Sequence, residues 1–156
     1  SGFVMGGLIP LGIAGCADGE IHWQILLYSL PMIAGIALIM MSNNGSDIEK
    51  DRKAGRRTLP TCIGRVRTLE LYRYLIVSWL TLAVVLPVTL LGPIGFVSGI
   101  LTVFLGGKII RKQLACTLEP EERIAAMKGI AMTNIVLNGA YTAAFAAGFI
   151  LEVLHG

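Results

Sequence analysis

Long uncharged stretches alternate with short charged segments along the whole chain. Four stretches contain no Asp, Glu, Lys or Arg, namely residues 1–17, 21–46, 74–107 and 129–151. A membrane-spanning helix needs about 20 apolar residues at a rise of 1.5 Å each, so the second and fourth stretches each fit one crossing. The first stretch is near the lower limit. This pattern predicts an all-α membrane protein.

The third stretch is too long for a single crossing. Its 34 residues would form a helix of about 51 Å. Gly92-Pro93 lies inside it, where a hairpin turn requires a break. We therefore predict a polytopic transmembrane helical bundle in a single membrane domain over residues 1–156, with five spans at about residues 2–16, 23–43, 70–91, 94–110 and 127–153.

The basic residues test this prediction. All 13 Lys and Arg residues fall within residues 50–73 and 108–128. With a hairpin at Gly92-Pro93 both segments lie on one side of the membrane, and the positive-inside rule makes that side cytoplasmic. A single crossing by residues 74–107 would separate them. We therefore expect a multi-pass protein of the cell membrane, with the loop after the second span in the cytoplasm.

The composition excludes several function classes. The chain is 54% hydrophobic and 15% charged, which argues against a disordered or an ordinary soluble protein. The net charge of +3 is too small to indicate nucleic-acid binding, so no nucleic-acid partner is expected. The three cysteines lack CxxC spacing and predict neither a disulfide framework nor a zinc site.

Some polar and aromatic residues lie within or beside the spans. Asn134 and Asn138 are four residues apart on the fifth span, where they indicate hydrogen bonding between helices or, alternatively, contact with polar groups of a substrate. Tyr72 and Trp79 lie near a predicted membrane interface, where an aromatic belt is the ordinary explanation.

The loop after the second span carries the candidate chemistry. If that span continues as a helix, Asp47 and Asp51 lie one turn apart on one face. Asn43 and Asn44 lie one turn earlier on the same side, and Glu49 points away. Carboxylate and amide oxygens suit Mg²⁺, which completes its coordination shell with water and substrate phosphate. This row of oxygens therefore predicts a magnesium site.

Basic side chains crowd the same loop, at Lys50, Arg52, Lys53, Arg56 and Arg57. Arginine clamps phosphate in bidentate fashion and lysine supplies a point charge. Carboxylates for a metal beside bases for phosphate indicate a diphosphate site. The plainer alternative is a solvated turn whose acids and bases pair with each other, and the two aspartates alone favour that alternative.

The amino-acid sequence of this loop resembles a known motif. Asn44-x-x-Asp47-x-x-x-Asp51, followed by Arg-Lys-Ala-Gly-Arg-Arg-Thr-Leu-Pro at residues 52–60 and by Gly64, is similar to the second aspartate-rich motif of the UbiA superfamily of intramembrane prenyltransferases. Within that superfamily it looks most like the 1,4-dihydroxy-2-naphthoate prenyltransferases of menaquinone synthesis. The five-span layout resembles helices five to nine of the nine-helix UbiA fold.

The resemblance implies a mechanism. In this superfamily two aspartate-rich motifs face each other, hold Mg²⁺ and bind the diphosphate of a polyprenyl donor, whose ionisation leaves an allylic carbocation that an aromatic acceptor attacks. By resemblance, Asp47 and Asp51 are catalytic metal ligands, and Asn44 is a further ligand or substrate contact. The resemblance also implies four diphosphate contacts, at Arg52, Lys53, Arg56 and Arg57. The expected partners are polyprenyl diphosphate, an aromatic acceptor, here 1,4-dihydroxy-2-naphthoate, and the lipid bilayer.

The first aspartate-rich motif of the superfamily has no counterpart in the sequence. We therefore expect the chain to be the C-terminal half of a longer prenyltransferase, with the missing N-terminal half supplied by the full chain or by a partner. Another aromatic prenyltransferase of this superfamily, or a non-enzymatic membrane helical partner or relic, remains an alternative. CDP-alcohol phosphotransferases also use membrane aspartates with Mg²⁺, but their Asp-Gly-x-x-Ala-Arg signature does not occur here.

Overall fold

The computed structural model describes residues 1–155, with side chains through residue 154. Within this range every regular element is a helix, which confirms the predicted all-α class. The elements in chain order are η1 (Val4–Leu8), α1 (Ile9–Asp18), α2 (Gln24–Tyr28), α3 (Leu30–Ser46), α4 (Ile48–Lys53), α5 (Leu59–Ile63), α6 (Arg65–Leu91), α7 (Pro93–Leu114), η2 (Pro120–Glu122) and α8 (Arg123–His155).

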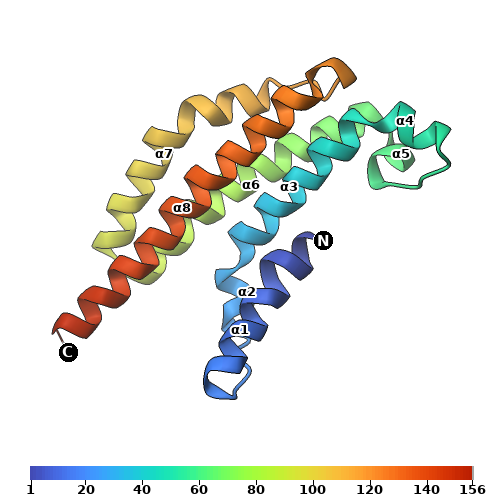
Figure 1. Cartoon of the computed structure of the whole chain (residues 1–156). Coiled ribbons are helices and arrows are strands. Elements are labelled where there is room, and N and C mark those ends of the chain that lie inside the picture. The colour runs from blue at the N-terminus through green and yellow to red at the C-terminus, as the bar shows by residue number, and fades with distance from the viewer. Residues whose placement is uncertain (156) are drawn as a thin grey trace.

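The four long helices α3, α6, α7 and α8 pack into one bundle, and η1 packs against α3 (Figure 1). The chain reverses between α6 and α7 at Gly92, whose φ of 55° and ψ of −124° suit a residue without a Cβ. Pro93 follows in the first turn of α7, where its missing N–H leaves no helical hydrogen bond unmade. The predicted hairpin is therefore confirmed.

All five predicted spans are helical, but they differ in length. In the described part of the chain, three helices are long and apolar enough to cross a membrane, and they correspond to the last three predicted spans: Arg65–Leu91, Pro93–Leu114 and Pro120–Leu154. The first predicted span falls on a shorter apolar helix, Val4–Asp18. The second is divided at Ser29 into α2 and α3, and Pro31 lies in the first turn of α3 because it cannot donate a helical hydrogen bond.

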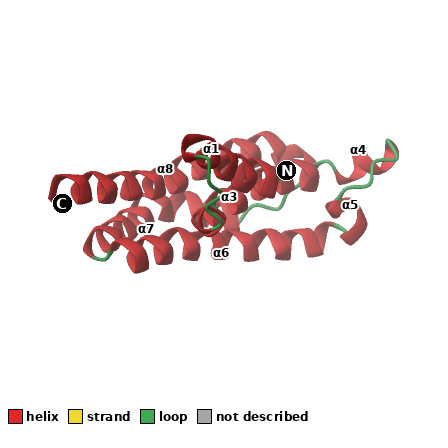
Figure 2. Ribbon diagram, turned by 90° about the horizontal axis from the view of Figure 1, so that it is seen from below, coloured by secondary structure: helices red, strands yellow, loops and turns green. Residues whose placement is uncertain are grey.

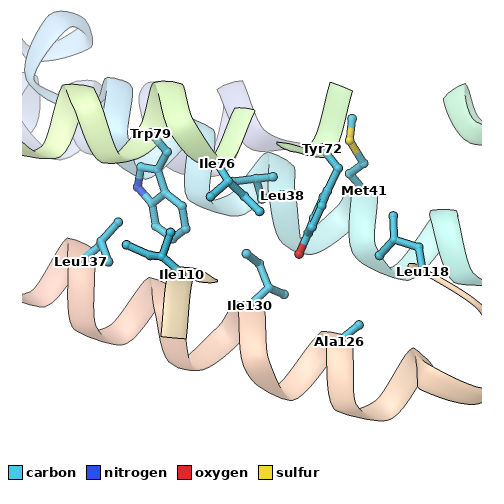
Figure 3. Packing of buried hydrophobic residues seen from close by; sticks show 10 residues of the cluster. All are labelled: Leu38, Met41, Tyr72, Ile76, Trp79, Ile110, Leu118, Ala126, Ile130 and Leu137. Carbon is cyan, nitrogen blue, oxygen red and sulfur yellow. The ribbon is translucent and has the colours of Figure 1, made fainter. Parts of the chain in front are cut away.

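The hydrophobic core lies where α3, α6 and α8 meet. Figure 3 shows side chains of α6 facing those of α8, together with side chains of α3 and with Ile110 of α7; Trp79 and Tyr72 are fully buried. Their polar atoms are satisfied between helices. The Tyr72 hydroxyl donates to Gln113 Oε1 at 2.8 Å, and Trp79 Nε1 donates to Asn138 Oδ1 at 3.2 Å. The aromatic-belt interpretation of Tyr72 and Trp79 is therefore wrong, because both rings belong to the core.

Asn134 and Asn138 connect α8 to its neighbours. Asn134 Nδ2 donates to the backbone oxygen of Gly35 on α3 at 3.0 Å, and Asn138 Nδ2 donates to Asn134 Oδ1 at 3.0 Å. With the bond from Trp79, these contacts confirm the predicted hydrogen bonding between helices. In an apolar environment such bonds stabilise helix association by about 1 kcal/mol each.

Both basic segments lie at the same end of the bundle. Figure 1 shows α4, α5 and the loop between α7 and α8 at one end, and the Gly92 turn at the other. Figure 2 shows α4 and α5 projecting beyond the long helices at that end. The ion pair between Arg65 and Glu119 joins the two segments directly, and Arg123 of the second segment pairs with Asp47, just before the first. This arrangement is the one that the five-span prediction requires.

Candidate functional site

The aspartate motif lies at the junction of α3 and α4. α3 ends at Ser46, and Asp47 leaves helical geometry with φ −102° and ψ 15° before α4 begins at Ile48. The Asp51 N–H still donates to the Asp47 backbone oxygen at 2.8 Å. The two aspartates are therefore one turn apart, as predicted, although the helix bends at the first of them.

Asp47 faces the N-terminus of α8. Arg123 Nη2 donates to Asn43 Oδ1 at 2.7 Å and lies 3.1 Å from Asp47 Oδ2. Because Asn43 and Asp47 share one partner, they lie on the same face, as their spacing predicted. The predicted ligand Asn44 is half-buried, and its side chain forms no hydrogen bond within the described structure.

Asp51 lies on α4, and its side chain is buried and bonded to the turn that follows this helix. It is 3% exposed, and its Oδ1 accepts a hydrogen bond from Arg56 Nη1 at 3.2 Å. The Arg56 N–H closes the turn by donating to the Asp51 backbone oxygen at 2.8 Å. Asp51 Oδ2 is buried without a hydrogen-bond partner among the described residues. Because a buried polar atom without a partner is costly, this oxygen suits a bound cation.

The four predicted diphosphate contacts do not gather in one place. Arg56 binds Asp51, and Arg52 Nη2 donates to the Thr61 backbone oxygen at 3.3 Å. Arg57 is exposed and forms no ion pair in the part of the chain that is described. Lys53 lines a pocket beside Asp47. The structure therefore leaves Lys53 next to the motif and directs Arg52 and Arg56 to contacts within the loop.

A shallow pocket of about 360 Å³ opens beside Asp47, between α4 and the loop that joins α7 to α8. Its lining residues are Ser46, Asp47, Glu49, Lys50, Lys53 and Pro120. It combines one predicted metal ligand, Asp47, with a second carboxylate, Glu49, and two lysines. Lys50 was among the basic residues that indicated a diphosphate site, but the family resemblance did not include it among the diphosphate contacts, although it lies three residues after Asp47.

Glu49 binds Arg65 and also lines the pocket beside Asp47. Both carboxylate oxygens of Glu49 lie 2.8 Å from Arg65 Nη2, and this hydrogen bonding holds the pKa of Glu49 below its usual range. Arg65 Nη1 also donates to the backbone oxygens of Gly45 and Leu118. Arg65 therefore joins α3, α4, α6 and the loop before α8, a role that its position in the sequence did not reveal.

Comparison with known proteins places this site in a family. Residues 1–135 match the UbiA prenyltransferase family. The chain belongs to that family. It is 38% identical over 64 residues to 1,4-dihydroxy-2-naphthoate octaprenyltransferase of Bacillus subtilis (strain 168), a match that covers 41% of this chain and 21% of that protein. No solved structure is significantly similar to the chain.

A second relative carries a different name. The chain is 36% identical over 58 residues to UbiA prenyltransferase domain-containing protein 1 homolog of Drosophila melanogaster, across 37% of this chain and 16% of that protein. The chain therefore matches only about a fifth or less of the length of either relative. The similarity establishes membership of the UbiA family rather than a particular acceptor.

Family membership raises the question of whether these residues fit Mg²⁺. Among the described residues, no group of three or more His, Cys, Asp or Glu side chains could hold a metal. Mg²⁺ usually takes only one or two carboxylates and completes its shell with water and phosphate oxygens. Asp47 and the partnerless Oδ2 of Asp51 fit such an ion. These two carboxylates match that donor requirement, and the described residues supply no closed cage of ligands around it.

Proposed function

We propose that the chain forms part of a Mg²⁺-dependent prenyltransferase that transfers a polyprenyl group from polyprenyl diphosphate to an aromatic acceptor through an allylic carbocation. The chain is a member of the UbiA prenyltransferase family. The observation that supports the proposal most directly is the pair of aspartates one turn apart, in which one buried oxygen of Asp51 has no partner among the described residues. The name of the Bacillus relative favours 1,4-dihydroxy-2-naphthoate as the acceptor.

Each side chain of the motif has a distinct role in this reaction. Asp47 and Asp51 hold the ion, with Asn44 as a further ligand, and Arg56 fixes one oxygen of Asp51 so that the other is left for metal. Bound Mg²⁺ supplies a Lewis acid that stabilises charge on the departing diphosphate. Lys50 and Lys53 place positive charge in the pocket beside Asp47, where it stabilises the same charge.

The proposed site requires a second wall. The described residues supply two carboxylates, and the matched segments are a small part of longer relatives. We propose that the chain corresponds to the C-terminal half of a prenyltransferase and that the facing motif comes from the rest of the full chain or from a partner.

Product analysis tests the proposed reaction. The full native chain, purified in lipid nanodiscs, is incubated with Mg²⁺, a polyprenyl diphosphate and either 1,4-dihydroxy-2-naphthoate or a hydroxybenzoate. A prenylated naphthoate that disappears with EDTA is the expected result. Prenylated hydroxybenzoate alone would overturn the acceptor but keep the reaction class. No product with either acceptor, despite intact protein, would favour a non-enzymatic membrane partner.

We propose that the motif loop lies in the cytoplasm, because its basic residues follow the positive-inside rule. Ala54 is exposed in that loop, so a single cysteine there, in a background without Cys16, Cys62 and Cys116, reports which side it faces. We expect an impermeant maleimide to label Ala54→Cys in inverted vesicles and not in intact cells. Labelling in intact cells only would contradict the cytoplasmic placement.

A further inference from the structure

The first residue of α8 reaches across to the aspartate motif. One nitrogen, Arg123 Nη2, lies 2.7 Å from Asn43 Oδ1 and 3.1 Å from Asp47 Oδ2. Two hard oxygens one turn apart thus share one positively charged atom. An amide oxygen and a carboxylate oxygen are also the donors that a divalent cation prefers. The guanidinium therefore lies against oxygens that suit a metal ion.

This contact leaves the guanidinium incompletely satisfied. Arg123 Nε is buried and has no hydrogen-bond partner among the described residues. A guanidinium carries five N–H donors, and a buried donor without an acceptor is unfavourable. The side chain as a whole is 41% exposed, so a route to water is open. Arg123 can therefore exchange its contact with Asp47 for contact with water or another acceptor.

The loop before α8 is anchored without Arg123. Leu118 is fully buried against Gly45, where an added Cβ would lie 2.9 Å from Leu118 Cδ1. Leu118 has a φ of 55°, an unfavourable value for leucine that the surrounding contacts must hold. Arg65 donates to the backbone oxygens of both residues. These contacts keep the loop in place when Arg123 releases Asp47.

We propose that Arg123 occupies the Asn43 and Asp47 oxygens as an internal cation, is displaced when a divalent metal binds there, and is then free to bind the diphosphate. The inference rests on the proposed function, because that reaction requires the metal. Before the ion arrives, Arg123 neutralises Asp47 just as Arg56 neutralises Asp51. Once displaced, its charge remains next to Asp47, which lines the pocket with Lys50 and Lys53.

This exchange couples the affinity of the site for metal to its affinity for diphosphate. A guanidinium that competes for Asp47 weakens metal binding to the site without substrate. The displaced guanidinium then becomes available to an anion, so diphosphate binding favours metal binding and, by linkage, the metal favours diphosphate. Arg123 therefore acts through Asp47 to keep the site from holding a metal ion before the substrate arrives.

Two binding measurements on Arg123→Gln test this role in the full native chain. The first is the affinity for Mn²⁺ without substrate, measured by electron paramagnetic resonance, which we expect to increase about five- to tenfold because a competing charge is gone. The second is the affinity for inorganic diphosphate at saturating Mn²⁺, which we expect to fall about fivefold because an anion partner is lost. A purely structural role would weaken both.

Lys128→Gln is the matched control. It removes the same charge from the same helix, and Lys128 contacts neither Asn43 nor Asp47 in the described structure. Both affinities should stay within about twofold of the wild-type values. If Arg123→Gln does not fold, Arg123→Lys retains a charge but not the planar fork, and Mn²⁺ binding about two- to threefold tighter than wild type is expected.

Unchanged or weaker Mn²⁺ binding by the tested Arg123 variant would overturn the proposed exchange. Asp47→Asn separates this failure from failure of the proposed function. If Asp47→Asn binds Mn²⁺ as the wild type does, the metal site itself is wrong. If Asp47→Asn loses Mn²⁺ while Arg123→Gln has wild-type affinity, only the role of Arg123 is wrong.

Discussion

Asp51→Asn is expected to reduce prenyl transfer by about a thousandfold, which corresponds to roughly 4 kcal/mol of lost transition-state stabilisation. Asparagine has the size of aspartate, so the packing around this 3% exposed side chain is retained. The neutral amide, however, supplies neither the charge that binds metal nor the ion pair with Arg56. The measurement is kcat of the full native chain at saturating Mg²⁺, together with its thermal unfolding midpoint.

Glu70→Gln is the control for this substitution. Glu70 is an exposed carboxylate in the first part of α6, on the same side of the bundle as the motif. Removing its charge should change kcat by no more than about twofold. An Asp51→Asn variant that retains more than about a tenth of the wild-type kcat would contradict the metal-binding role. Loss of folded protein would instead show that the Arg56 pair is structural.

Hydropathy predicted where the helices lie because apolar length and turn residues are local properties. The hairpin at Gly92 follows from a run too long for one crossing, and its glycine has the positive φ that such a turn needs. The ends of helices were less predictable. α6 begins at Arg65 rather than near residue 70 because its charged first turns continue the helix beyond the apolar segment. The break at Ser29 lies inside a stretch without charged residues, so the hydropathy pattern did not reveal it, although Pro31 follows in the first turn of α3.

The sequence predicted only those features of the site that depend on spacing along a single helix. The shared face of Asn43 and Asp47 follows from 3.6 residues per turn. Their arginine partners do not follow from spacing. Arg123 is 80 positions from Asn43 in the chain, and only the packing of α3 against α8 brings them together. The same lack of tertiary information made Trp79 look like an interfacial residue, although it lies in the core.

Gly35→Leu is expected to destabilise the bundle by about 2–4 kcal/mol, because it overfills a tight contact and breaks a hydrogen bond between helices. A Cβ at Gly35 would lie 2.2 Å from Asn134 Oδ1 and 2.9 Å from Trp79 Cζ2. The backbone oxygen of Gly35 accepts the hydrogen bond from Asn134 Nδ2. Leucine therefore forces α6 and α8 away from α3. The thermal midpoint of the full native chain in detergent measures the effect.

Gly107→Leu supplies the matched comparison, because nothing lies within 4 Å of a Cβ added at Gly107. Its thermal midpoint should be unchanged or slightly higher, since leucine favours helix by up to about 1 kcal/mol over glycine. Equal midpoints for the two variants would mean that α3 and α8 do not meet at Gly35. Because α3 carries Asp47 and α8 carries Arg123, separating these helices should also weaken the contact between those two side chains. A substitution at this one glycine is therefore expected to alter the position of the motif at the end of the bundle.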